Sequence, residues 1–409
     1  MKKICVTVSG AVLFLFLGLI YAWSIFAAPL ENDFGWSRAQ TSLTFTICMS
    51  CFCVGGLAAS KLKNKIKTQL IMALGGIVVA VGFYLTSFTA GLWHLYIFYG
   101  VFCGFAVGMC YNCLLTILPL WHPKRVGFIN GAMLMVYGFA SLILGNPISA
   151  VINAMGWRTA FKVLAVVFLA LFLILSVFMQ TPDTTPRFVQ SPADGDSAND
   201  VSTLDMLKSR KFWLFFIWEC MVGAVGLALI GHAAAIASDV FTPAAWLAIA
   251  VGSVSAASGI GRLICGILSD AIGDIKTAIF MNIAGLAGCI MLIFCLETNS
   301  MALLFAGFIL CGMCFGAGPA LNASFTRRTF GSKYFSTNFS VMSFSLLFSS
   351  IAGTYLVGII RSASDTYMTA FLLILVYLIT GLGALGIIFV KSVRAERSQR
   401  SVLLSSNIH

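Results

Sequence analysis

The residue best placed to do chemistry in this chain is an arginine, Arg262, because it lies inside a long apolar run from Trp246 to Leu268. Asp270 follows eight residues later, so a helical Arg262 lies roughly 12 Å inside a membrane, near the midplane of a hydrocarbon core about 30 Å thick. A charge there costs roughly 2.5–3.5 kcal/mol on insertion scales, and such residues usually face a wet cavity or another polar group. Arg262 therefore predicts either an anion-binding site, or a structural arginine that snorkels to the interface or pairs with a buried carboxylate.

Three further polar side chains lie inside apolar runs, and each has two interpretations. Glu219 lies at a depth comparable to Arg262. It predicts either a proton-coupling carboxylate that pairs with Arg262 when no substrate is bound, or a carboxylate hydrogen-bonded to a neighbouring helix. His232 predicts either a packing residue or a residue that lines a substrate pathway. Asn112, beside Tyr111, is either a packing residue or a donor of its amide to a substrate.

The composition indicates that helices in a membrane position these side chains. Of 409 residues, 60% are hydrophobic and 10% are charged, with a mean hydropathy of +0.98. A soluble protein of this length cannot bury so much apolar surface. The 13 cysteines show no metal-ligand spacing and fall mostly inside apolar runs, which is typical of small packing residues in a reduced protein. We therefore expect no metal and no cofactor.

Twelve apolar runs predict an all-α membrane protein with twelve transmembrane helices in two pseudo-symmetric six-helix bundles. A polar stretch with three prolines and five aspartates separates the two sets and is typical of a linker. We expect an N-terminal bundle over 1–180, a cytoplasmic linker over 181–211, a C-terminal bundle over 212–390 and a cytoplasmic tail over 391–409. The runs are about 4–30, 37–60, 68–90, 92–121, 127–154, 158–180, 212–238, 244–269, 277–297, 301–325, 335–360 and 367–390.

The positive charges indicate how these helices are oriented. Of the 25 Lys and Arg, about twenty fall in the termini and loops on one side, and four fall on the other, with Arg262 between them. The positive-inside rule then predicts a cell (plasma or inner) membrane protein with both termini in the cytoplasm. This topology explains the net charge of +11, so the charge does not indicate a nucleic-acid partner.

The two sets of helices also repeat in sequence. Matching residues recur at offsets of about 210 in corresponding helices: Gly56 with Gly266, Thr159–Phe161 with Thr369–Phe371, and Gly104 and Gly108 with Gly312 and Gly316. Parallel six-helix repeats place a substrate path at their interface and permit alternating access. Small residues four apart also let helices pack closely.

One loop motif resembles that of a known family. Gly266, Asp270, Gly273 and Lys276 have the spacing of the cytoplasmic loop motif of the major facilitator superfamily. A second copy spans 56–67, with Ser60 and Asn64 where the family has aspartate and glycine, so we expect the N-terminal loop to hold its helices less strongly. The resemblance implies a secondary carrier.

Further stretches are similar to the oxalate/formate antiporter family, whose members exchange or import small carboxylates. They are YAWS at 21–24, Gly104-x-x-x-Gly108-x-x-Tyr111, WHPKR at 121–125, GWRTAF at 156–161 and KFW at 211–213. The resemblance implies that Arg262 neutralises one carboxylate of the substrate. It also implies that Tyr21 and Tyr111 belong to an aromatic cage around the substrate, with Phe315 in place of a tryptophan.

The chain departs from that family at the second cation. The family's lysine position falls on Leu346, and residues 335–360 carry no charge; Pro319 and Ser343 stand where the family has aromatic residues. One fixed cation balances one carboxylate, and burying an unpaired second one costs several kcal/mol. We therefore expect a monocarboxylate such as pyruvate, lactate or formate, carried by proton symport or anion exchange. An oxalate/formate-type dicarboxylate antiporter is the alternative.

Two other classes of protein are alternatives to a carrier. A membrane enzyme would need a nucleophile or metal motif, and no HExxH, GxSxG or Walker sequence is present, so we expect no enzymatic activity. A membrane sensor with a transporter fold stays open as an alternative, although the linker and tail are short for a signalling domain. We expect a monomer whose partners are a small organic anion, protons in the case of symport, and the lipid bilayer.

Overall fold

The structure is a computed structural model that describes residues 2–63, 65–122, 126–182, 200–240, 244–331, 333–364 and 366–406. Several predicted features lie outside these ranges: Asn64 of the degraded motif, Lys124 and Arg125 of the WHPKR stretch, and residues 183–199 of the linker. The side chains of the basic tail, residues 391–406, also lie outside the description.

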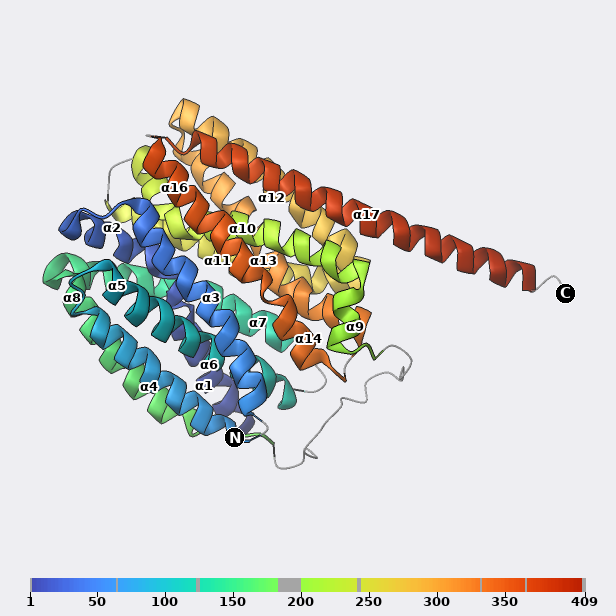
Figure 1. Ribbon diagram of the computed structural model, residues 1–409, viewed down its shortest axis with the longest axis horizontal. Helices are drawn as coiled ribbons and strands as arrows, with labels where there is room; N and C mark the ends of the chain where they lie inside the picture. The colour runs from blue at the N-terminus through green and yellow to red at the C-terminus, as the bar shows by residue number, and fades with distance from the viewer. Residues whose placement is uncertain are drawn as a thin grey trace.

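Every regular element in the described ranges is helical (Figure 1). In chain order they are α1 (Lys2–Leu17), η1 (Gly18–Ala22), α2 (Trp23–Phe34), α3 (Arg38–Leu62), α4 (Thr68–Thr86), α5 (Leu92–Leu95), η2 (Tyr96–Cys103), α6 (Gly104–Leu120), α7 (Val126–Gly138), α8 (Ala140–Ser176), α9 (Thr203–Lys208), α10 (Arg210–Val240), α11 (Ala244–Ile272), α12 (Asp274–Thr298), α13 (Met301–Phe330), α14 (Phe335–Met342), α15 (Ser345–Ser350), η4 (Ile351–Tyr355), α16 (Leu356–Ala363) and α17 (Met368–Ser406).

Eleven helical stretches of the described chain are long and apolar enough to cross a membrane. One of them, Ile129–Ser176, has 48 residues, which is about twice the length that a bilayer needs. Gly156 interrupts it with a non-helical backbone (φ 81°, ψ 160°), a conformation that favours glycine. This stretch therefore makes two passes, and the described chain makes the twelve passes that hydropathy predicted.

The outward faces of these helices suit a lipid environment. Large apolar side chains are exposed on many helices, among them Val166, Ile174, Phe280, Phe294 and Val376. Apolar surface on this scale is not stable in water but is stable in contact with lipid tails. The chain is a multi-pass membrane protein.

Glycines set the closest helix pairs in the same way in both halves of the chain. A Cβ added at Gly108 of α6 would lie 2.0 Å from the carbonyl oxygen of Phe52 in α3. A Cβ at Gly316 of α13 would lie 2.2 Å from the carbonyl oxygen of Ser258 in α11. No larger residue fits at either position. The prediction that small residues four apart let helices pack closely is therefore confirmed for these two helices.

The N-terminal half (residues 2–182) meets the C-terminal half (200–406) along two seams. In one seam α7 and α8 pack against α11, and a Cβ at Gly138 would lie only 2.7 Å from the Cα of Gly259. In the other seam α3 packs along α14, α15 and α16. Figure 1 shows α3 beside α16 at one end of the bundle. We call the end that carries α9 and the turns near Lys63, Gly273 and Gly331 the linker side, and the other end the opposite side.

The loop motif at the end of α11 is tied to α13 by one arginine. Arg328 contacts the carboxylates of Asp270 (2.7 Å) and Asp274 (3.3 Å). The Asp270 side chain is mostly exposed, whereas that of Asp274 is buried and also accepts a hydrogen bond from Ser324. Gly273 turns the chain between them at φ 86°.

The remaining motif residues make fewer contacts. Lys276 is exposed, and a Cβ on Gly266 would meet no atom within 4 Å. In the degraded copy, Ser60 contacts Ser340 of the C-terminal half at 3.1 Å. The N-terminal loop position thus forms a neutral contact across the seam where the family has a charged residue.

Candidate functional site

A small cavity lies between the two halves, with a volume of about 30 Å³, enough for roughly two water molecules. Glu219 and Asn322 of its wall lie nine and eight residues from the linker-side ends of α10 and α13, which is about 12–14 Å along a helix. The cavity is therefore near the middle of the membrane. Its wall consists of Tyr21, Met49, Phe52, Tyr111, Tyr137, Glu219, Pro319, Asn322, Phe339, Ser343 and Leu346.

Two broken helices contribute to this wall. The first pass changes to a 3₁₀ helix over Gly18–Ala22, and this segment carries Tyr21. Gly18 lies so close to Tyr137 that an added Cβ would be 2.2 Å from the Tyr137 carbonyl oxygen. The eleventh pass is interrupted between α14 and α15, where Ser343 accepts a hydrogen bond from Cys53 of the other half through its carbonyl. Irregular backbone at membrane depth is tolerated where it lines a cavity or is buried in protein.

Arg262 is buried beside the cavity and is only 1% exposed. Its Nη1 donates to the carbonyl of Leu134, in the N-terminal half, at 2.7 Å, and its Nη2 contacts the Tyr21 hydroxyl at 3.4 Å. The guanidinium lies 5.8 Å from the Tyr21 ring and 5.7 Å from the Tyr137 ring. Both rings also belong to the cavity wall, whereas Arg262 itself does not. In this conformation the guanidinium is thus separated from the cavity by two tyrosines.

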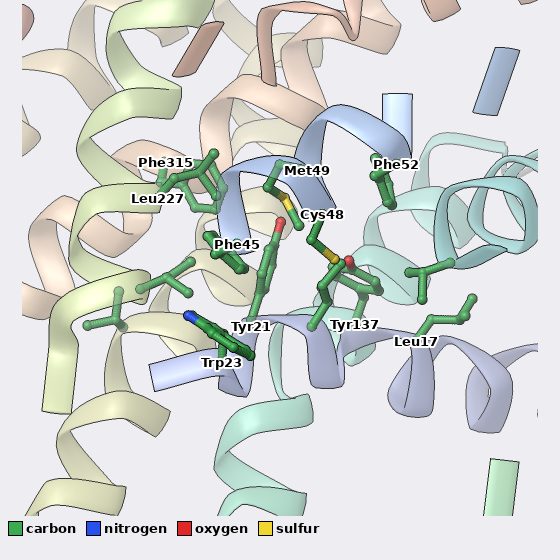
Figure 2. Packing of buried hydrophobic residues seen from close by; sticks show 14 of the residues in the cluster. Leu17, Tyr21, Trp23, Phe45, Cys48, Met49, Phe52, Tyr137, Leu227 and Phe315 are labelled. Atoms are coloured by element: carbon green, nitrogen blue, oxygen red, sulfur yellow. The ribbon is translucent and has the colours of Figure 1, made fainter. Parts of the chain in front are cut away.

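The aromatic cluster around Arg262 is close-packed. Tyr137 lies edge-on to Tyr21 at 5.1 Å and to Tyr111 at 5.3 Å, measured between ring centroids. Phe315 completes the group, 6.0 Å from Tyr21 and fully buried. Figure 2 shows Tyr21, Tyr137 and Phe315 converging from different helices. The structure brings together Arg262, Tyr21, Tyr111 and Phe315, which the sequence singled out, and adds Tyr137.

Glu219 lies in the cavity wall and is 4% exposed. Its Oε1 accepts a hydrogen bond from the Asn322 amide at 2.9 Å, and it forms no ion pair with Arg262. In this conformation Glu219 is therefore a carboxylate hydrogen-bonded to a neighbouring helix, the second of its two interpretations. Proton coupling by Glu219 stays a prediction.

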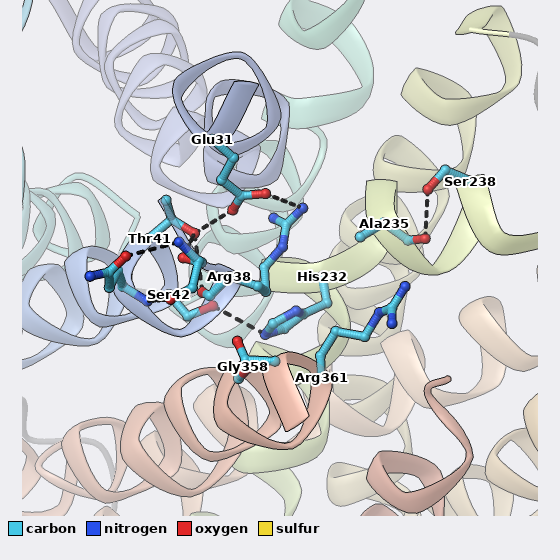
Figure 3. A network of polar contacts seen from close by, with 12 residues as sticks. Glu31, Arg38, Thr41, Ser42, His232, Ala235, Ser238, Gly358 and Arg361 are labelled. Carbon is cyan, nitrogen blue, oxygen red and sulfur yellow. Dashed lines mark hydrogen bonds and ion pairs between the residues drawn. The ribbon is translucent and has the colours of Figure 1, made fainter. Parts of the chain in front are cut away.

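Two other sequence candidates lie away from the cavity wall. His232 lies on the opposite side, where its ring contacts the hydroxyl groups of Ser42 (3.4 Å) and Tyr367 (3.2 Å), as Figure 3 shows for Ser42. Asn112 lies near the linker side, where its Oδ1 accepts from the Lys63 ammonium at 3.2 Å. In this conformation both hold helices together.

Tyr137 and Asn322 are wall residues that sequence reasoning did not identify. Each is a polar side chain within a mostly apolar run, Tyr137 in GAMLMVYGFA and Asn322 in GAGPALNASF. The same signal led to Glu219 and Arg262. Tyrosine and asparagine are too common in membrane helices for that signal to be decisive.

Comparison with known proteins places this geometry in context. The family model described as Major Facilitator Superfamily matches residues 8–353. The "Uncharacterized MFS-type transporter YhjX" of Escherichia coli is 26% identical over 80% of this chain and 80% of its own length. The "Oxalate:formate antiporter" of Oxalobacter formigenes is 22% identical over 79% of this chain and 76% of its own length. "Monocarboxylate transporter 12" of Rattus norvegicus is 28% identical over 34% of this chain and 29% of its own length.

Solved structures show a similar fold. A crystal structure of the nucleoside transporter NupG (D323A mutant) superposes with a TM-score of 0.71, covering 95% of this chain and 100% of that chain. The sequence identity between the two is 12%. At this identity the likeness concerns the arrangement of the helices alone.

Proposed function

The chain belongs to the Major Facilitator Superfamily, and we propose that it is a secondary carrier of small monocarboxylates that works by alternating access. We infer a carrier rather than an enzyme or a sensor. We also infer that the linker side is cytoplasmic, since most of the Lys and Arg of the described residues lie there. In this proposal segments 1–180 and 212–390 rock against each other in a monomer.

The observation that carries the proposal is the uncompensated charge of Arg262. No ion pair within the described residues includes Arg262, although its side chain is almost fully buried. A buried charge without a counter-ion is unfavourable. An anion that binds beside Arg262 would neutralise this charge, so the site favours anion binding.

Alternating access gives such an anion a route to Arg262. The Leu134 carbonyl that holds Nη1 belongs to the other half of the molecule. When the halves separate, this contact breaks, and the guanidinium loses a neutral acceptor. A substrate carboxylate then replaces it with two charge-assisted hydrogen bonds, and the Tyr21 hydroxyl supplies a further donor.

Monocarboxylates fit the cavity wall better than dicarboxylates do. Leu346 lies in the wall at the position where the related family has a lysine, and the rest of the wall is mainly aromatic and apolar. A second carboxylate would therefore have no cation to neutralise it. The names of two relatives also indicate carboxylates, oxalate and formate for one and monocarboxylates for the other.

A dicarboxylate antiporter of the oxalate/formate type is the second candidate. The match to the Oxalobacter protein covers more of this chain than the match to the monocarboxylate transporter, 79% against 34%. The larger share of the chain that is matched favours the dicarboxylate antiporter, whereas the single cation near the cavity favours the monocarboxylate carrier.

Uptake into liposomes that contain the purified protein tests the proposal. We expect labelled pyruvate, lactate or formate to enter, and unlabelled oxalate to compete poorly. Arg262→Ala should lower uptake by roughly 30-fold or more, because a charged hydrogen-bond partner of the carboxylate is lost. Arg262→Lys should be intermediate, since it keeps the charge but not the two-pronged geometry.

Arg210→Ala is the matched control, because Arg210 is exposed at the start of α10. Wild-type uptake by Arg262→Ala, or oxalate exchange that outcompetes every monocarboxylate, would contradict the proposal. Substrate-induced thermal stabilisation without any uptake would indicate a sensor instead.

A further inference from the structure

The helix that carries Arg262 also carries two serines on the same face. Ser255, Ser258 and Arg262 are spaced by three and four residues along α11, so their side chains lie in one row. All three residues are buried, and Ser255 Oγ, Ser258 Oγ and Arg262 Nε each lack a hydrogen-bond partner among the described residues. An unpaired buried polar group is costly, and native structures rarely keep one without a reason.

Other serines of the same helix do not share this property. The Ser253 hydroxyl donates to the Ala250 carbonyl at 2.8 Å, and the Ser269 hydroxyl donates to the Gly266 carbonyl at 3.1 Å. A helical serine can thus satisfy its hydroxyl on its own helix. The helix leaves the hydroxyls at positions 255 and 258 unused.

The surroundings of α11 show which way this row faces. Gly259 meets α7, where an added Cβ would lie 2.8 Å from a backbone oxygen, and Gly261 meets α13, where the same distance would be 2.5 Å. A third side faces lipid and carries the exposed Ile249, Ile260 and Ile267. The serine row lies on the remaining side, toward the first pass, because Arg262 of the same row contacts Tyr21 and α11 packs against η1 and α2.

The first pass supplies a similar hydroxyl from the N-terminal half. Ser24 follows Tyr21 by three residues, and its Oγ is also buried without a partner among the described residues. The first pass ends on the opposite side, where α11 begins, so the two run in opposite directions. Ser24 and Ser258 therefore both lie about 4–6 Å from the contact of Tyr21 with Arg262 toward the opposite side, and Ser255 lies about 10 Å from it.

Resting on the proposed function, we propose that the hydroxyls of Ser24, Ser255 and Ser258 form a second binding site for the substrate carboxylate, between Arg262 and the opposite side. When the two halves part on that side, these hydroxyls donate to the carboxylate, which then passes to the guanidinium. Hydroxyl groups are neutral donors, so they bind an anion less tightly than a second cation would. Passage requires binding that is favourable but weak enough for release.

Removal of the hydroxyls tests whether they bind the anion. For the double variant Ser255→Ala, Ser258→Ala we expect uptake from the opposite side to need about tenfold more pyruvate, lactate or formate for half-saturation. Its thermal unfolding temperature should equal or exceed that of the wild type, because a buried hydroxyl without a partner contributes only its desolvation cost to the folded state. A merely structural serine would give the reverse result.

Ser349→Ala is the matched control for a structural serine. Its hydroxyl is buried and donates to the Cys220 carbonyl of α10 at 2.9 Å. Loss of this hydrogen bond should lower the unfolding temperature and leave the half-saturating concentration unchanged.

Thiol labelling tests independently whether the row becomes accessible. In intact cells that express the full chain, a membrane-impermeant anionic methanethiosulfonate should modify Ser255→Cys and Ser258→Cys from outside and block uptake. Excess substrate should slow this reaction. Ser253→Cys is the matched control, because Ser253 is on the same side of α11 as the exposed isoleucines. The wild type measures the background from its own 13 cysteines.

The outcomes separate this inference from the proposed function. If the wild type takes up no monocarboxylate, the proposed function fails. If the wild type transports but the alanine variant keeps its half-saturating concentration, the inference fails and the function stands, even where the cysteines react, because the passage would then be wet without binding the anion. Cysteines at 255 and 258 that react only in inside-out vesicles, or no faster than Ser253→Cys, would also overturn it. Should the alanine variant not fold, labelling decides.

Discussion

Single side chains decide how charge is distributed around the cavity, and Arg262 shows this most clearly. A backbone carbonyl and the faces of aromatic rings solvate its guanidinium without neutralising it. The protein thus stabilises the charge enough to bury it, yet keeps it available to an anion. Glu219 accepts a hydrogen bond from the Asn322 amide. Glu219 lies in the cavity wall, whereas Arg262 lies behind Tyr21 and Tyr137.

Lys63 is a further charged side chain, half-buried near the linker side and outside the membrane spans. Its ammonium donates to the carbonyl oxygen of Asn112 at 3.3 Å and to Oδ1 at 3.2 Å, and to the hydroxyl of Thr116. Burial lowers the pKa of Lys63 from its ordinary value of 10.5, because desolvation disfavours the charged form. No carboxylate is among these partners.

We expect this pKa to make stability depend on pH. The unfolded chain binds the Lys63 proton more tightly than the folded chain, so stability increases as pH rises from the folded pKa toward 10.5. Lys63→Met should remove this slope, which cannot exceed about 1.4 kcal/mol per pH unit for one proton. Thermal unfolding between about pH 8 and pH 10.5 measures it. The exposed Lys61→Met is the control, and equal slopes for the two variants would refute the expectation.

At the scale of helices, the crossing of α7 and α11 holds the two halves together beside the site. Gly138 and Gly259 meet there without side chains between them. Gly259 lies one turn before Arg262 on the same helix, so this close approach lets Arg262 reach the Leu134 carbonyl. A helix crossing about which the halves rock needs small residues at its centre.

Filling this crossing should therefore impair transport. A Cβ at Gly259 would lie 2.8 Å from the Met135 carbonyl oxygen, and backbone atoms cannot move aside as a flexible side chain does. We expect Gly259→Val to cost roughly 1–3 kcal/mol of stability and to lower the rate of uptake more than the substrate affinity. Thermal unfolding and initial uptake rates measure these effects. Gly386→Ala, where a Cβ meets no atom within 4 Å, should behave as the wild type; a similar loss in both would exclude a role of the crossing.

At the scale of the whole molecule, polar contacts close the opposite side. Ser42 of α3 contacts His232 of α10, and the amide of Ala39 donates to the Ser362 hydroxyl at 3.3 Å. The ion pair of Glu31 with Arg38 (2.9 Å) lies in the same region, where Figure 3 shows the side chains of both halves together. Hydrogen bonds of this kind between neutral groups are each weak, so the closure can open without a large barrier.

Locking this closure should stop transport. A Cβ at Gly358 would lie 3.0 Å from the Cβ of Ser42, and a disulfide needs roughly 3.5–4.5 Å, so a small shift lets Ser42→Cys and Gly358→Cys form one. We expect oxidation of the double variant to abolish uptake and a reductant to restore it. Each single variant, and the wild type with its own 13 cysteines, should keep its uptake under oxidation. Undiminished uptake by the cross-linked double variant would show that this side does not open.

The sequence by itself was enough to locate the twelve passes to within a few residues and to place Arg262 and Glu219 at the depth where the cavity lies. These features follow from length and hydropathy, because a segment that enters the membrane must satisfy its own backbone as a helix. The glycines four residues apart likewise indicated helices that can pack closely. Length and hydropathy do not depend on which face a helix turns toward its neighbours.

Only the tertiary structure decided which polar groups meet. Arg262 bonds to Leu134, 128 residues away, and Glu219 bonds to Asn322, 103 residues away, rather than to each other. Tyr137 enters the cluster, while Asn112 and His232 hold helices elsewhere. These partners depend on the rotation of each helix about its axis. That rotation is set by side-chain packing between helices far apart in the chain, which no local pattern records.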